Sequence, residues 1–155
     1  MMRFLRHPAT NACCLSLFTA FYAAVFFLAG PVLRSAGAAA LAAEQSAKNP
    51  LWKSWCGLLA EGRQDIVVCA AALLTAAAVV LLVFRRHPYD EYHTALLTQC
   101  LAAACVLTLL AIAVFFVLVL ANPAQIVAQF ALFITIHWLT VVLADLAYVV
   151  LCRWR

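Results

Sequence analysis

Four long apolar segments occupy most of this 155-residue chain, and they limit its fold more than any other feature. They cover about residues 13–33, 66–84, 95–121 and 124–151. Each has at least 19 residues, and a helix needs about 20 apolar residues to cross the ~30 Å hydrocarbon core of a bilayer. The sequence therefore predicts an all-α, four-span transmembrane helical bundle that forms a single membrane domain over residues 1–155.

Composition excludes a water-soluble domain. Hydrophobic residues make up 68% of the chain and charged residues 10%, whereas a soluble domain carries about 25% charged residues. The net charge of +4 comes mostly from short segments at the membrane faces, where basic residues suit anionic lipid headgroups. We therefore expect two partners, the lipid bilayer and other transmembrane helices in a hetero- or homo-oligomer, and no nucleic acid.

The connections between the segments predict the topology. Only Asn122 and Pro123 separate the third segment from the fourth, so these two should form a tight antiparallel hairpin. An even number of spans places both termini on one side, and that side carries six basic residues against four on the other. Because basic residues favour the cytoplasmic side, both termini are expected to be cytoplasmic. The six are Arg3, Arg6, Arg85, Arg86, Arg153 and Arg155.

The first segment has two interpretations. A basic start, an apolar run and Ala-x-Ala patterns at residues 36–38 and 40–42 resemble a cleavable secretory signal. However, the run is longer than the ~7–15 residues of a usual signal, and Pro31 separates it from those patterns. We expect a retained transmembrane helix; the alternative is cleavage of residues 1–42, which would leave three spans.

The loop before the second segment predicts a short interfacial helix. Asn49 is a suitable N-cap and Pro50 suits the first helical position. Leu51, Trp52, Trp55, Leu58 and Leu59 would then share one side, and tryptophan favours the membrane surface. The alternative is an ordered loop with two anchoring tryptophans. The interface anchors expected over the whole chain are Trp52, Trp55, Tyr89, Tyr92 and Trp154.

Few polar side chains lie inside the apolar segments. His137 is near the middle of the fourth segment, and Asp145 follows eight residues later. An ionisable side chain is costly in lipid, so both should face protein or water. The candidate intramembrane polar site comprises His137, Asp145, Gln99, Thr108, Gln129 and Thr140.

The short turn at residues 122–123 fixes which residues lie at the same depth. Positions whose numbers sum to about 245 should be level, which pairs His137 with Thr108 and Asp145 with Gln99. Thr108 and Gln99 are nine residues apart, on opposite sides of a straight helix. At most one pair can therefore form across the hairpin, and the other needs the first or second helix, a partner chain or a kink.

Four roles remain open for His137 and Asp145: hydrogen bonds that fix packing, a proton or cation pathway, docking to another membrane protein, and haem ligation by His137. No second histidine lies at the depth of His137 to complete an axial pair for haem. The segment His87–His93 holds acidic residues and two histidines, but its spacing matches no zinc motif. We expect no metal and no cofactor.

The seven cysteines form no Cys-x-x-Cys pair, and five lie within or at the edge of apolar segments, where cysteine behaves as a small hydrophobic residue. Cys152 and the Cys13–Cys14 pair are juxtamembrane, so acylation is the alternative to simple packing there.

The sequence carries none of the G-x-S-x-G, P-loop, H-E-x-x-H or G-x-G-x-x-G motifs, so we do not expect an enzyme. Alanine-rich faces in the second and third segments favour close helix packing. The leading hypothesis is a non-catalytic accessory or structural subunit that packs against other membrane helices. The alternative is a small oligomeric transporter or channel with a proton or cation path past His137 and Asp145.

Overall fold

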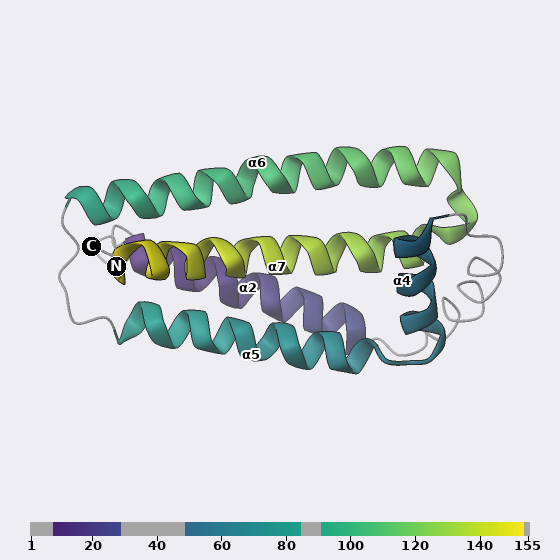
Figure 1. The fold of residues 1–155 in the computed structure, drawn as a ribbon, viewed down its shortest axis with the longest axis horizontal. Coiled ribbons are helices and arrows are strands. Elements are labelled where there is room, and N and C mark those ends of the chain that lie inside the picture. The colour runs from purple at the N-terminus through teal and green to yellow at the C-terminus, as the bar shows by residue number, and fades with distance from the viewer. Residues whose placement is uncertain (1–7, 29–48, 85–90, 154–155) are drawn as a thin grey trace.

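The computed structural model describes residues 8–28, 49–84 and 91–153 (Figure 1). Helices make up nearly all of this part of the chain, and no strand occurs in it, which confirms the all-α prediction. The elements are α2 (Pro8–Leu28), α4 (Pro50–Ala60), α5 (Gln64–Val83), α6 (Glu91–Ala121), the 3-10 turn η1 (Pro123–Gln125) and α7 (Ile126–Arg153). Four helices, α2, α5, α6 and α7, are long and apolar enough to cross a membrane.

The helices extend past the apolar segments that predict them. α2 begins at Pro8 and α6 at Glu91, five and four residues before the respective segments. An acidic residue in a first turn is favoured by the helix dipole, and proline suits a first turn, so polar residues continue these helices outward. Residues 29–33, the end of the first predicted span, lie outside the described residues.

The four long helices lie along one axis, with α4 across one end (Figure 1). The start of α2, the end of α5, the start of α6 and the end of α7 meet at the opposite end. There Ala12, Leu82, Leu97 and Tyr148 form a small buried cluster, called here the Tyr148 cluster. α6 and α7 run in opposite directions, and η1 joins them.

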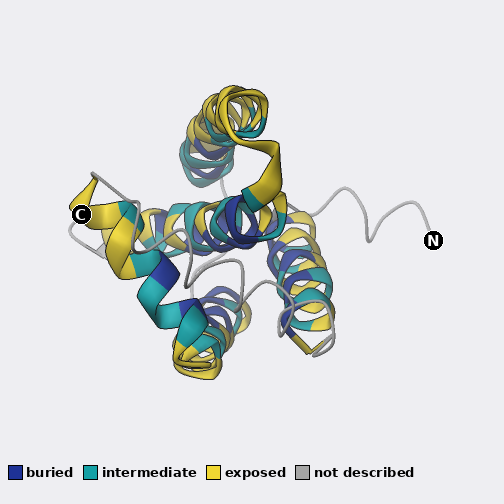
Figure 2. Cartoon of the chain, turned by 90° about the vertical axis from the view of Figure 1, so that its right-hand side faces the viewer, coloured by how far each residue is buried: buried dark blue, intermediate teal, exposed yellow. Residues whose placement is uncertain are grey.

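α7 is the central helix. It contacts α2, α5, α6 and α4, and in the end view of Figure 2 it lies between α6 and the other long helices. In its most apolar stretch 44% of the residues are buried, against 6% for α6. α6 packs mainly on α7 and leaves most of its surface uncovered.

Small residues line the contacts between the helices. On α2 they recur every three or four residues, at Ala9, Ala12, Ser16, Thr19 and Ala23, all buried. On α5 the corresponding buried residues are Ala71, Thr75 and Ala78. Small side chains let helix backbones approach closely, as in other membrane bundles. Large apolar residues such as Phe21 and Leu73 instead point outward.

Only part of the alanine-rich face expected on α5 packs against other helices. Ala71 and Ala78 are buried, while the other members of the two alanine triplets, at 70, 72, 76 and 77, are exposed. A helix turns by about 100° per residue, so one residue of three consecutive alanines faces the bundle.

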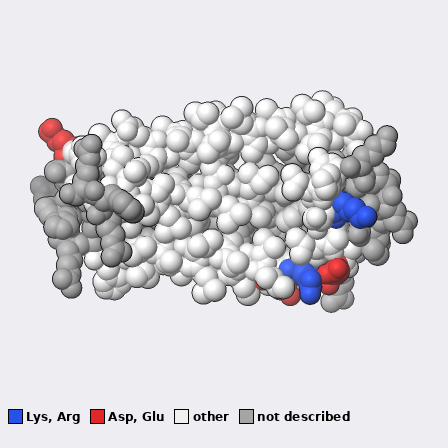
Figure 3. Space-filling view, viewed as in Figure 1, with Lys and Arg blue, Asp and Glu red and all other residues white. Residues whose placement is uncertain are grey.

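Charged side chains lie at the two ends, and a wide uncharged belt separates them on the face shown in Figure 3. Within the described residues, Asp145 is the one charged residue inside that belt, and it is fully buried. An uncharged belt between charged ends is the surface expected of a protein that lipid surrounds.

α4 forms where the sequence predicts a short helix. The Asn49 side chain accepts a hydrogen bond of 3.0 Å from the Leu51 backbone N–H, and Pro50 occupies the first turn. The side that packs on the bundle is rotated from the one expected. Cys56 and Leu59 are buried on it, whereas Leu51 is 80% exposed.

Candidate functional site

Polar side chains of α7 form hydrogen bonds with each of the other three long helices. Asp145 bonds to α2, Trp138 to α5 and His137 to α6. A fourth contact joins α4 to the backbone of α7 at Ala128. The sequence places His137 and Asp145 in the candidate site, and the geometry below shows which of the other expected residues join them.

Asp145 lies on the side of α7 that faces α2. Its side chain and that of Ser16 are both fully buried, and the Ser16 hydroxyl donates to Asp145 Oδ2 over 2.6 Å. This length is typical of a hydroxyl that donates to a carboxylate. The second oxygen, Oδ1, is buried and has no hydrogen-bond partner among the described residues.

Of the two level pairs, that of Asp145 and Gln99 does not form. Gln99 is exposed on α6, and the first helix supplies the partner instead. The helix periodicity explains this, because Thr108 lies on the side of α6 that faces α7. Gln99 is nine positions earlier, so it points to the opposite side of the helix.

His137 forms the pair that the hairpin register predicts. Thr108 Oγ1 lies 3.0 Å from His137 Nδ1, so either the hydroxyl or the ring N–H donates, depending on the tautomer. The imidazole is stacked with two aromatic rings, with centroid distances of 6.0 Å to Tyr22 and 6.1 Å to Phe133. α2, α6 and α7 therefore all contribute to the surroundings of this ring.

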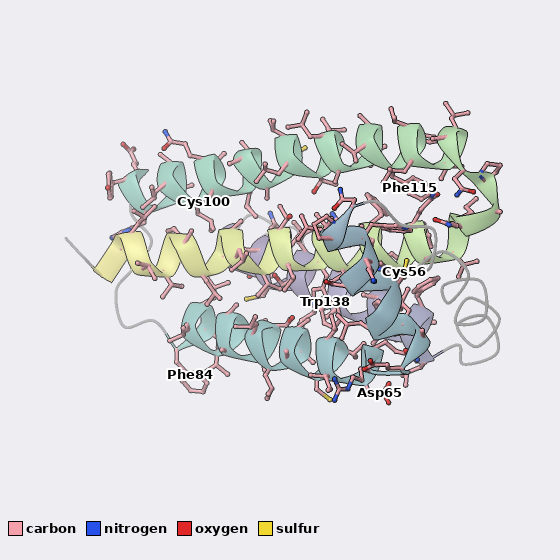
Figure 4. The ribbon with its side chains drawn as sticks, turned by 45° about the vertical axis from the view of Figure 1, so that its right-hand side comes forward. Cys56, Asp65, Phe84, Cys100, Phe115 and Trp138 are labelled. Atoms are coloured by element: carbon pink, nitrogen blue, oxygen red, sulfur yellow. The ribbon has the colours of Figure 1, made fainter. Side chains whose placement is uncertain are left out.

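Trp138 makes a contact that sequence reasoning missed. Its side chain is 1% exposed and lies between α7 and α5 (Figure 4), and its Nε1–H donates to Thr75 Oγ1 over 2.8 Å. Thr75 in turn donates to the Ala71 carbonyl over 2.8 Å. A tryptophan in the middle of an apolar segment could have indicated this contact, since a buried indole N–H needs an acceptor.

Gln129 stabilises the end of α6. Its amide Nε2 donates to the carbonyls of Leu118 and Asn122, at 3.1 and 3.2 Å. The last carbonyls of a helix lack partners within the helix, so a buried amide here satisfies backbone groups that lipid cannot. Thr140 does not join the site, because its hydroxyl donates to the Ile136 carbonyl of its own helix over 2.7 Å.

An aromatic cluster surrounds the contact between α6 and α7. Phe115 packs against Phe130 and Phe133, with ring centroids 5.7 and 5.4 Å apart, and Phe26 of α2 packs on Phe130 at 5.2 Å. The numbers 115 and 130 also sum to 245, so the register argument could have found this contact.

The expected interface anchors fall into three groups. Trp55 Nε1–H donates to the Ala128 carbonyl over 3.0 Å, and Trp52 is partly buried beside it. Tyr92 is 47% exposed at the start of α6. Tyr89 and Trp154 lie outside the described residues.

Metal ligands do not gather in the part of the chain that is described: no group of three His, Cys, Asp or Glu side chains there is arranged to hold an ion. Most of the segment His87–His93 falls outside this part, because residues 85–90 are not described.

No protein-family model matches the chain, and no curated protein or solved structure is detectably similar to it.

The contact between Trp138 and Thr75 yields a direct test. Thr75→Val keeps the side-chain shape but leaves the indole N–H without its acceptor, so we expect the free energy of unfolding to fall by about 1–2 kcal/mol. Thr135→Val is the matched control, because the similarly buried Thr135 hydroxyl bonds, among the described residues, to the Ala131 carbonyl of its own helix. Unfolding by a denaturing detergent in mild micelles measures both. Equal losses in the two variants would contradict the assigned role of Thr75.

Proposed function

We propose that this chain is a multi-pass integral membrane protein with both termini cytoplasmic. It acts as a non-catalytic accessory or structural subunit that packs against other membrane helices. The observation that carries this proposal is the hydrogen-bonding pattern of α7, whose polar side chains bond to three different helices. Such a pattern favours a rigid bundle over an open path.

Several features support the membrane arrangement. The four long helices are apolar, and at about 1.5 Å per residue the 20 residues of α5 match a hydrocarbon core of about 30 Å. α4 lies across one end of the bundle, where its two tryptophans suit the membrane surface. The turn at η1 then places the hairpin of α6 and α7 with its tip on the same side as α4.

The contacts of α2 favour its retention as the first span. Ser16 is the residue that bonds to Asp145, and α2 packs against both α5 and α7. Loss of α2 would leave a carboxyl group without its hydroxyl partner in an apolar environment, which is costly.

The outer face of α6 is the proposed docking surface. Only 6% of the most apolar stretch of α6 is buried, against 22% for α5. Gln99 is exposed there, in line along the helix with Val106 and Leu110, which are each 58% exposed. Lipid cannot bond to an exposed amide, whereas a neighbouring transmembrane helix can.

Crosslinking in native membranes tests this surface. A photoreactive residue at Val106 or Leu110 should give a discrete protein adduct, whose mass shows whether the partner is a second copy or another chain. The matched control is the same substitution at Leu73 on α5, which is 72% exposed and should capture mainly lipid. Adducts of equal yield from α5 and α6, or lipid adducts alone from α6, would overturn the proposal.

A second candidate function is a proton or cation path, and it is favoured by Oδ1 of the buried Asp145, which has no hydrogen-bond partner in the described part of the chain. His137 and Asp145 are eight residues apart, which is about 12 Å along α7, and they bond to different helices. This separation favours the structural role.

Flux measurements separate the two candidates. We expect liposomes that contain the protein to pass protons and monovalent cations no faster than empty liposomes. Asp145→Asn and His137→Asn should leave that rate unchanged. A flux through the parent protein that Asp145→Asn abolishes would establish the path and reject the purely structural role.

A further inference from the structure

A histidine and a cysteine meet at the end of the bundle opposite α4. His93 is the third residue of α6, and Cys152 is the second-last residue of α7. His93 Nδ1 lies 3.3 Å from Cys152 Sγ, and both side chains are partly buried. The numbers 93 and 152 again sum to 245, so the register of the hairpin brings the two together.

This pair has the chemistry of an activated nucleophile. A thiol is a weak nucleophile while it keeps its proton, and an adjacent imidazole can accept that proton. The thiolate that results is the reactive form of cysteine. The distance between the sulfur and the ring nitrogen is short enough for this transfer to occur directly, without an intervening group.

The position of His93 and Cys152 indicates which class of electrophile the thiol would meet. Cys152 directly follows the last apolar segment, and Arg153 and Arg155 follow it in the sequence. Under the membrane placement proposed above, on which this inference rests, the thiol lies at the cytoplasmic surface of the bilayer. A long-chain acyl thioester fits there, with its chain in lipid and its polar carrier in the adjoining water.

Apolar surface for such a chain lies beside the thiol. Val150 and Leu151, immediately before Cys152, are 52% and 49% exposed. On the inner side Cys152 packs against the Tyr148 cluster, as do Cys13 and Cys100. The sulfur is therefore held in place from within the bundle while exposed apolar residues lie next to it.

We propose that Cys152 is a site of S-acylation by a long-chain acyl thioester such as an acyl-coenzyme A, with His93 as the base. His93 takes the thiol proton, and Cys152 Sγ attacks the thioester carbonyl carbon. A new carbon–sulfur bond forms to Cys152, and the carbon–sulfur bond to the carrier breaks. The carrier leaves as a thiol after it receives the proton from the imidazolium, so no oxidant or reductant is required.

Labelling of the reconstituted full chain tests this proposal. Liposomes that contain the protein are incubated with an alkyne-tagged palmitoyl-coenzyme A, and the label that hydroxylamine releases is measured. We expect one acyl chain per protein, its loss in Cys152→Ser, and a rate at least about 10²-fold lower in His93→Gln, because a positioned base contributes about 10²-fold or more.

Cys14→Ser is the matched control, since Cys14 is an exposed cysteine of α2. This substitution should leave the label unchanged. Circular dichroism and flotation of the same liposomes check that each variant is folded and inserted. Insertion without any label on the parent protein would overturn the acylation proposal alone, as would a label that Cys152→Ser retains. Failure of the parent protein to insert would instead overturn the membrane placement.

Discussion

Lipid offers no hydrogen bonds, and this constraint determines how the polar side chains of the central helix are arranged. In a soluble bundle, water outside the core drives apolar faces together, but between helices in a bilayer that drive is absent. Specific polar contacts and close packing take its place. Here Asp145, Trp138 and His137 each find a partner on a different neighbouring helix. These contacts link α7 to α2, α5 and α6.

Close packing depends on the small residues that face α7 and each other. Ser16, Thr19 and Ala23 on α2 and Ala71, Thr75 and Ala78 on α5 combine little side-chain volume with hydroxyl groups where a bond is needed. Thr75 shows both roles, because it is small enough for close approach and supplies the acceptor for Trp138. The exposed face of α6 carries Gln99 together with the small residues Ala95 and Ala102, and it is the surface that we propose a partner helix covers.

Much of the architecture could be predicted from the sequence. The lengths of the apolar segments predict the four long helices. The two-residue connection at 122–123 predicts that His137 and Thr108 lie at the same depth. The same arithmetic applies to His93 with Cys152 and to Phe115 with Phe130. Depth follows from counting residues along two helices that share a turn, so it needs no knowledge of their neighbours.

What could not be predicted is which other helix each polar residue meets. The partner of Asp145 depends on where α2 packs around α7, and nothing in the order of residues fixes that angle. The contact between Trp138 and Thr75 and the rotation of α4 that buries Cys56 depend on the same unknown. Helix periodicity places residues on a face, but packing against several helices decides which neighbour that face meets.

The most direct test of the central role of α7 is a double-mutant cycle on Ser16 and Asp145. The variants are Ser16→Ala, Asp145→Leu and both together, with unfolding in mild detergent as the measurement. The account predicts a coupling energy of about 0.6–2 kcal/mol for this pair, the range of hydrogen bonds between membrane helices. The cycle on Gln99 and Asp145, which are level but not in contact, should give a value near zero. No coupling between Ser16 and Asp145, or equal coupling in both cycles, would contradict the arrangement of the helices around α7.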